Sequence, residues 1–221
     1  MILQDIINII ESVAPLSYQE SWDNSGLQVG DRNAEVHAAL LTVDVTESVV
    51  NEAIEKHCDL IISHHPLIFR GLKQITGSTT QERCIEKAIR HNIAIYSSHT
   101  SMDVYLHGVS GKIADKLDII NYHILCPTTD DNVGLGVIGE LKTPMKSDDF
   151  IHFVQNIFDC SLRYIKPCDE NITTVAICGG AGAEFITRAI AQGADIYITA
   201  NHSIKNSLFV LEDDGVANVL Y

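Results

Sequence analysis

"DLIISHHP" (residues 59–66) is a short run of aliphatic residues that ends on two adjacent histidines and a proline. A brief apolar run without polar alternation is typical of a β-strand that is covered on both faces, as in the parallel sheets of α/β proteins. We therefore predict a strand over 59–63 in the interior of a sheet. His64 and His65 then lie at its carboxyl end.

Helical and strand patterns alternate on both sides of this stretch. The expected strands are 39–43, 93–97 and 119–125, and the expected helices are the first 13 residues, 46–57 with Thr46 as its cap, 80–92 and 108–117. The segment 21–30, "SWDNSGLQVG", is rich in Asp, Asn, Ser and Gly, which predicts an ordered loop with a packed Trp22. Alternating strands and helices favour an α/β architecture.

A polar connector, "CPTTDDN", begins at Cys126 and predicts a second lobe over 127–221, after a first lobe over 1–126. The expected elements of the second lobe are strands over 133–141, 161–165, 173–178 and 194–200, a helix over 146–159 capped by Ser147, and a glycine turn into a helix over 179–193. We therefore expect a two-lobed α/β protein with mixed or parallel sheets flanked by helices.

Composition narrows the function classes. The 221 residues are 46% hydrophobic, enough for a substantial core, and the net charge of −14 disfavours nucleic acid as the main partner. A bound divalent metal can still supply positive charge for a phosphorylated ligand. The six scattered cysteines include no CxxC pair, which indicates reduced thiols in the cytoplasm. No apolar run approaches the length needed to cross a bilayer, and the amphipathic start of the chain does not fit a signal peptide.

Candidate functional residues stand where the predicted strands end. His64 and His65 follow one strand, His99 and Asp103 follow another, and Asp44 follows a third. Ligands of open α/β sheets bind beyond the carboxyl ends of the strands, so these side chains are expected to share one crevice. Imidazole and carboxylate together suit zinc, iron, manganese or nickel.

The adjacent histidines suggest two ions. Neighbouring residues of a regular strand point to opposite sides, so His64 and His65 could not both bind one ion from such a strand. Pro66 and the strand end relax this restriction, and diverging side chains suit two ions, each bound by one histidine, with a carboxylate between them. A bridged pair of metals activates a shared water and clamps a phosphate or carbonyl oxygen, which is hydrolytic chemistry.

Other sites are weaker candidates. The "GGAGAE" turn (179–184) could cradle an anion and support metal-free nucleotide binding, although a tight strand-to-helix turn explains it equally well. Cys58 and Cys178 have no histidine nearby in the sequence, which argues against a cysteine nucleophile. The remaining histidines show no ligand spacing.

Six stretches in order resemble the family of GTP cyclohydrolase 1 type 2 homologues, also described as Ngg1-interacting-factor-like proteins. They are 21–30, 60–76, 93–104, 108–117, 136–141 and 175–199. The resemblance implies a two-lobed chain in a ring-shaped homohexamer, with two metal ions per subunit in an interior-facing site. The HHP motif places metal ligands at His64 and His65, and the HTxxD motif places another at Asp103. His99 of that motif would lie beside the metals as a proton-transfer group.

The chain departs from the family pattern near its end. It has "ITANHSIKNSLF" where the family has "ITGD" or "ITGE", and "DDGVANVLY" stands about where a GHxxSE-like segment with the last two ligands is expected. Our leading hypothesis is a dinuclear-metal-dependent hydrolase of a small nucleotide-like or phosphorylated substrate, with His99 assisting proton transfer. The alternative is a non-catalytic metal-binding or regulatory oligomer with an incomplete site.

Overall fold

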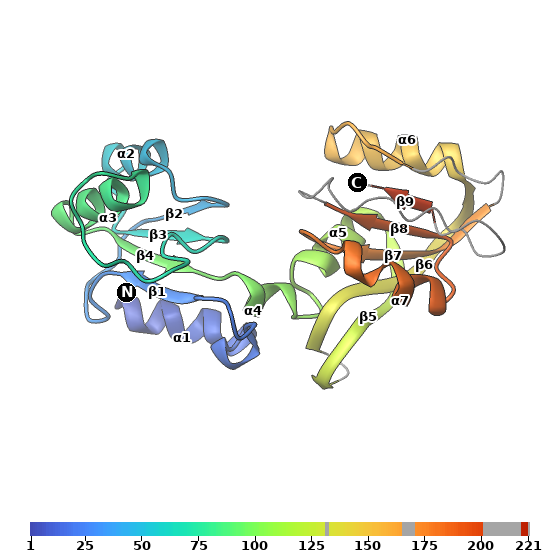
Figure 1. Ribbon diagram of the computed structural model, residues 1–221, viewed down its shortest axis with the longest axis horizontal. Helices are drawn as coiled ribbons and strands as arrows, with labels where there is room; N and C mark the ends of the chain where they lie inside the picture. The colour runs from blue at the N-terminus through green and yellow to red at the C-terminus, as the bar shows by residue number, and fades with distance from the viewer. Residues whose placement is uncertain (131–132, 165–170, 201–217, 221) are drawn as a thin grey trace. The chain divides into compact units, whose positions relative to one another are not determined.

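The chain folds into two compact units, Met1–Met102 and Asp103–Tyr221, each of which has its own sheet (Figure 1). The computed structural model describes residues 1–130, 133–164, 171–200 and 218–220. Helices flank both sheets, so the predicted α/β class with mixed sheets is confirmed. No helix within the described ranges is both long enough and apolar enough to cross a membrane.

The sheet of the first unit has four strands in the order β1-β4-β3-β2. They are β1 (Gly26–Val29), β2 (Ala39–Thr42), β3 (Leu60–Ser63) and β4 (Ala94–Ser97). β2, β3 and β4 are parallel, and β1 pairs antiparallel with β4. The predicted strand over 59–63 is therefore confirmed as an interior strand.

The predicted loop over 21–30 is wrong in its second half, because that half forms the edge strand β1. Glycines with positive φ stand at both ends of the strand, Gly26 at 112° and Gly30 at 123°. A Cβ on Gly30 would lie 2.7 Å from the Cβ of Ala94, so the close approach of β1 to β4 requires glycine there. The turn-forming residues of this segment therefore led to the wrong prediction of a loop where a strand forms.

Helices cover both faces of this sheet (Figure 1). They are α1 (Leu3–Val13), η1 (Leu16–Tyr18, a 3-10 turn), α2 (Glu47–Glu55) and α3 (Thr80–Arg90). Ile61 and Ile95 pack in a cluster with residues of α2 and α3, whereas Leu60 and Tyr96 pack in a cluster with residues of α1. Successive side chains of β3 therefore enter two different cores, which explains why "LIIS" is apolar without alternation.

Side-chain caps begin two of these helices. Thr46 accepts a hydrogen bond from the Val49 amide, as predicted, and Thr79 accepts one from the Glu82 amide at 3.2 Å. The buried carboxylate of Glu82 in turn accepts hydrogen bonds from the amide and hydroxyl of Thr76, both at 2.8 Å. Glu82 therefore ties the start of α3 to the preceding loop.

Glu82→Gln is expected to make stability depend less on pH. Hydrogen bonds from the amide and hydroxyl of Thr76 lower the pKa of Glu82 below its usual 4.5. A lowered folded-state pKa stabilises the protein above the unfolded pKa, and this stabilisation is lost as the pH falls through the folded value. The melting temperature of the variant should lie below that of wild type at neutral pH and approach it below about pH 4. Glu86→Gln, on the same helix, is the control and should give curves parallel to wild type.

Among the residues that the structure describes, the sheet of the second unit has five strands, which pair in sequence order. They are β5 (Ile119–Asp130), β6 (Val133–Lys146), β7 (Asn171–Cys178), β8 (Ile196–Thr199) and β9 (Asn218–Leu220). β5, β6 and β7 are antiparallel, and β7, β8 and β9 are parallel. The short helix α4 (Thr100–Asp103) spans the boundary between the units. The helical elements within the second unit include α5 (Val109–Lys116), α6 (Ser147–Phe158), η2 (Ala183–Phe185) and α7 (Ile186–Ala191).

The described residues of the second unit form two hydrophobic clusters. Phe150 and Val154 of α6 and Ala114 of α5 pack in one cluster with strand residues that include Val175. Ala189 of α7 packs in another cluster with Leu125, Ile138 and Tyr197. The central strands are therefore covered on both faces, as in the first unit.

The lobe boundary, one helix cap and one strand differ from the prediction. The division between lobes was placed at 126/127, whereas the compact units divide between Met102 and Asp103, because β5 pairs with β6 along its length. Ser147 is the first residue of α6 and not its cap, which is Lys146. In the predicted strand 161–165, residues 161–163 have no regular structure, and 165 lies outside the described residues.

Candidate metal centre

The carboxyl ends of the parallel strands bring four of the predicted site residues together, namely His64, His65, His99 and Asp44. Backbone hydrogen bonds continue past the strands: the His64 amide donates to Thr42 O at 3.1 Å, and the Ser98 amide donates to Ser63 O at 2.9 Å. The His65 carbonyl accepts a 2.9 Å hydrogen bond from the hydroxyl of Ser63, which is itself buried. The two histidines therefore stand on backbone that the sheet holds in place.

Three imidazoles converge at this edge. His64, His65 and His99 each offer one ligand atom, and these atoms all lie within 4.8 Å of one another. The ring centroids of His64 and His65 are 5.0 Å apart, so the two side chains do not diverge as alternating strand residues would. The reason is that both follow Ser63, the last residue of β3, and lie outside its regular pleat.

Every one of these rings has an oxygen acceptor at Nδ1. The pairs are His64 with Ser98 O at 3.0 Å, His65 with Asp44 Oδ1 at 2.8 Å, and His99 with Asp23 Oδ1 at 2.8 Å. Carbonyl and carboxylate oxygens only accept, so in the neutral form of each ring the proton is on Nδ1 and the lone pair is on Nε2. Metal-binding histidines have this arrangement, with the second nitrogen donating to an oxygen that orients the ring. The donor set therefore suits a divalent transition metal.

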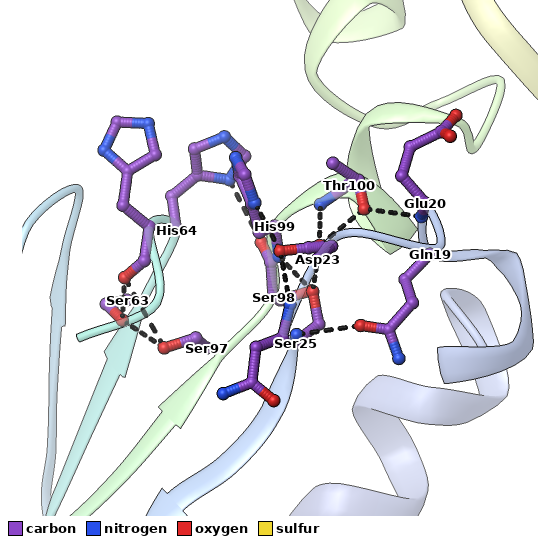
Figure 2. Close-up of polar contacts among 12 residues, drawn as sticks. Gln19, Glu20, Asp23, Ser25, Ser63, His64, Ser97, Ser98, His99 and Thr100 are labelled. Carbon is purple, nitrogen blue, oxygen red and sulfur yellow. Dashed lines mark hydrogen bonds and ion pairs between the residues drawn. The ribbon is translucent and has the colours of Figure 1, made fainter. Parts of the chain in front are cut away.

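The anchor of His99 is the buried carboxylate of Asp23, whose side chain has no exposed surface. It accepts hydrogen bonds from His99, from the amide and hydroxyl of Thr100, from the Asn24 amide and from the Ser25 hydroxyl (Figure 2). Burial raises the pKa of Asp23, but these hydrogen bonds outweigh burial and lower it to about 2. Asp23 is thus a fixed negative charge beside the histidines.

The two predicted carboxylates, Asp44 and Asp103, belong to different units of the chain. Asp44 lies at the cluster as predicted, where it is 64% exposed and orients the ring of His65. Asp103 is the last residue of α4 and the first residue of the second unit. Its role as a ligand stays a prediction. The segment 201–217, where the sequence departs from the family pattern, lies outside the described residues.

The glycine turn at 179–184 is occupied by the chain's own groups. The Gly182 amide donates to Thr199 Oγ1 at 2.9 Å, and the Gly182 carbonyl accepts from the Tyr197 hydroxyl at 2.6 Å. A Cβ on Gly182 would lie 2.6 Å from the Cβ of Cys178, so the turn is a packed junction between strand and helix. Burial also raises the pKa of Cys178 to about 12, which disfavours a thiolate nucleophile there.

Comparison with known proteins identifies the family of the chain. The family model described as Duf34/NIF3 (NGG1p interacting factor 3) matches residues 1–219. The chain belongs to the NIF3 family. The resemblance inferred from the six sequence stretches is thereby confirmed.

Named relatives and solved structures match most of the chain. A protein of Clostridium acetobutylicum named GTP cyclohydrolase 1 type 2 homolog is 37% identical over 204 residues, which cover 91% of this chain and 76% of the relative. The crystal structure of a Staphylococcus aureus hypothetical protein has a TM-score of 0.87 at 28% identity, covering 100% of this chain and 85% of that one. A Bacillus cereus protein related to NIF3 has a TM-score of 0.86 at 25% identity, covering 92% and 83%.

Asp23 is the site residue of this NIF3-family chain that sequence reasoning missed. It lies in the segment predicted to be a turn with a packed Trp22, 76 positions before His99. The available signal was the run "WDNSG" itself, where Asp, Asn and Ser stand together beside a tryptophan. In the same segment Trp22 is 56% exposed, so the prediction of a packed Trp22 is wrong.

Proposed function

We propose that this NIF3-family protein is a metal-dependent hydrolase that acts on small phosphorylated or nucleotide-like molecules. The observation that carries the proposal is the convergence of three imidazoles, each with Nδ1 bound to an oxygen acceptor. The name of the relatives, GTP cyclohydrolase 1 type 2 homolog, supports hydrolysis of a nucleotide as the reaction class. The name of the relatives indicates a class of reaction but does not identify the substrate of this chain.

In this proposal His64 and His65 hold metal together with Asp103. Nitrogen donors about 2.1 Å from one ion lie roughly 3.4–4.2 Å apart, and paired catalytic ions lie about 3.5–4 Å apart. The ligand atoms of His64, His65 and His99 lie within 4.8 Å of one another. The separation of the two proposed histidine ligands therefore suits one ion after small side-chain adjustments, and it also suits two neighbouring ions. A divalent ion at such a site supplies Lewis-acid activation and a water of lowered pKa.

His99 is the proposed proton-transfer group. Its Nδ1 donates to Asp23, so Nε2 is the atom that can accept a proton from water or return it to a leaving group. Asp23 fixes the tautomer and the orientation of the ring, because its other hydrogen bonds to Thr100 and Ser25 hold the carboxylate in place. A carboxylate that orients a histidine base is a recurring feature of hydrolytic sites.

The test is turnover by metal-loaded protein. Purified wild type, supplied with Zn²⁺, Mn²⁺, Fe²⁺ or Ni²⁺, is incubated with nucleoside triphosphates, nucleoside monophosphates and simple phosphoesters, and product is followed by chromatography. We expect metal-dependent turnover of at least one substrate and a loss of about 10²-fold or more in kcat for His99→Gln. The same rate after chelation of metal would contradict the proposal. Stoichiometric metal without turnover would favour the non-catalytic, regulatory alternative.

Assembly and location stay predictions. The ring-shaped homohexamer implied by the family resemblance corresponds to six times the chain mass of 24.3 kDa. Light scattering of the purified protein measures this mass directly, and a monomeric value would contradict the ring. The prediction of a cytoplasmic location rests on the six scattered cysteines of the sequence, which include no CxxC pair.

A further inference from the structure

Two exposed aromatic side chains lie beside His99. Trp22 is 56% exposed and Phe69 is 43% exposed. Their ring centroids are 5.9 Å apart, and they lie 6.0 Å and 6.4 Å respectively from the His99 ring. Single exposed apolar residues are ordinary, but a pair of large rings gathered on a histidine cluster is a feature that binding sites use.

Hydrogen bonds join the backbone segments from which this pair extends. The Asn24 side chain donates to the Ile68 carbonyl, and the Ile68 amide donates to Gln28 Oε1 at 3.0 Å. The Gln28 side chain also donates to the Asn24 carbonyl at 2.7 Å. Ile68 is next to Phe69, and Asn24 is two residues from Trp22. The hydrogen bonds therefore hold together the backbone segments that carry the two aromatic residues. A platform that is ordered before binding loses little entropy when a ligand arrives.

The geometry of the pair favours a flat ligand. The two rings are tilted by 54°, so a planar ring that stacks on one of them meets the other at an angle typical of aromatic pairs. A ligand ring in contact with this pair adjoins His99 and therefore the proposed reaction centre. A specific protein partner needs about 800 Å² of surface on each side, far more than two side chains provide.

We propose that Trp22 and Phe69 bind a planar heteroaromatic ring of the substrate and so determine its specificity. The proposal rests on the hydrolase function above and names its substrate class: molecules in which a fused or single aromatic heterocycle is joined to the group that reaches the metal site. Aromatic residues recognise bases in this way because every base offers a stacking face.

Fluorescence gives a direct test, because Trp22 is the only tryptophan in the chain. GMP and AMP are titrated into metal-loaded protein and into chelator-treated protein, with excitation at the red edge of indole absorption. Ribose 5-phosphate, which has the sugar and phosphate but no ring, is the matched probe. We expect saturable quenching by at least one of the two nucleotides and none by ribose 5-phosphate.

Variants separate the platform from the reaction. Phe69→Ala retains the Trp22 reporter and should weaken nucleotide binding about tenfold, whereas Phe69→Tyr should bind within about threefold of wild type. Tyr18→Ala, at another exposed aromatic residue of the first unit, should leave binding unchanged, and circular dichroism of each variant checks the fold. Equal quenching in Phe69→Ala and wild type, equal quenching by ribose 5-phosphate, or no quenching at all would overturn the proposal. A fluorescence change that follows protein concentration instead of ligand would also overturn it, in favour of an interface between copies.

The two proposals fail in different ways. Nucleotide binding that depends on Phe69, without hydrolysis under any metal, would contradict the hydrolase and retain the ring-binding site. Metal-dependent turnover with a KM unaffected by Phe69→Ala would retain the hydrolase and contradict the ring-binding site.

Discussion

Asp23→Ala is expected to lower the free energy of unfolding of the first unit by about 3–5 kcal/mol, because it removes the acceptor from several buried donors at once. The Asp23 carboxylate has no exposed surface and accepts from His99, Thr100, Asn24 and Ser25. Without it the Thr100 amide and the Ser25 hydroxyl lose an acceptor in a region that water does not reach easily. Urea denaturation measured by circular dichroism checks this value.

Asp31→Ala is the control for that loss. Asp31 is exposed, and among the described residues its side chain accepts hydrogen bonds from the amide and side chain of Asn33 in the same turn. Its removal should change the free energy of unfolding by less than about 1 kcal/mol. Equal effects of Asp23→Ala and Asp31→Ala would contradict the assignment of Asp23 as the structural anchor of the cluster.

Asp23→Asn separates charge from shape. The amide has nearly the same volume but presents an NH₂ group toward a donor, either His99 Nδ1 or the Thr100 amide. If it faces His99, the imidazole moves its proton to Nε2, the nitrogen that the proposed chemistry needs unprotonated. The loss of an orienting partner of this kind typically lowers metal affinity or activity 10- to 100-fold.

Phe150→Ala is expected to lower the free energy of unfolding of the second unit by about 3–5 kcal/mol. Phe150 of α6 is fully buried in a cluster with Leu117, Val137 and Ile172, so its truncation leaves a cavity between the helix and the sheet. Ile157→Ala, on the same helix, removes a side chain that is 41% exposed and should cost less than about 1 kcal/mol. Similar losses for the two variants would contradict the packing of α6 described above.

The sequence predicted the sheet of the first unit well, because burial on both faces leaves a distinctive pattern. "LIIS" lacks alternation since its residues enter two cores, and the polar residues that follow are held at one edge by parallel register. The strand β1 could not be predicted in the same way. It has only four residues and is bounded by glycines that the antiparallel edge pairing requires, so its sequence has the composition of a loop.

The candidate site was predictable where its residues are strand ends and not where they come from loops. His64, His65, His99 and Asp44 follow strands, and the topology rule brought them together. Asp23 comes from a turn far away in the sequence, and only tertiary structure pairs it with His99. The diverging orientation expected for His64 and His65 was wrong, because strand alternation does not apply beyond Ser63, the last residue of β3.

Calorimetric titration of chelator-treated protein with Zn²⁺ and Mn²⁺ tests the metal centre most directly. Wild type is compared with His64→Ala/His65→Ala and with the control His37→Ala/His152→Ala, which removes two exposed imidazoles elsewhere. We predict binding of at least one ion per chain in wild type and control, and a loss of at least 100-fold in affinity in the first variant. Absence of stoichiometric binding in wild type, or equal binding by all three proteins, would contradict the assignment of His64 and His65 as metal ligands.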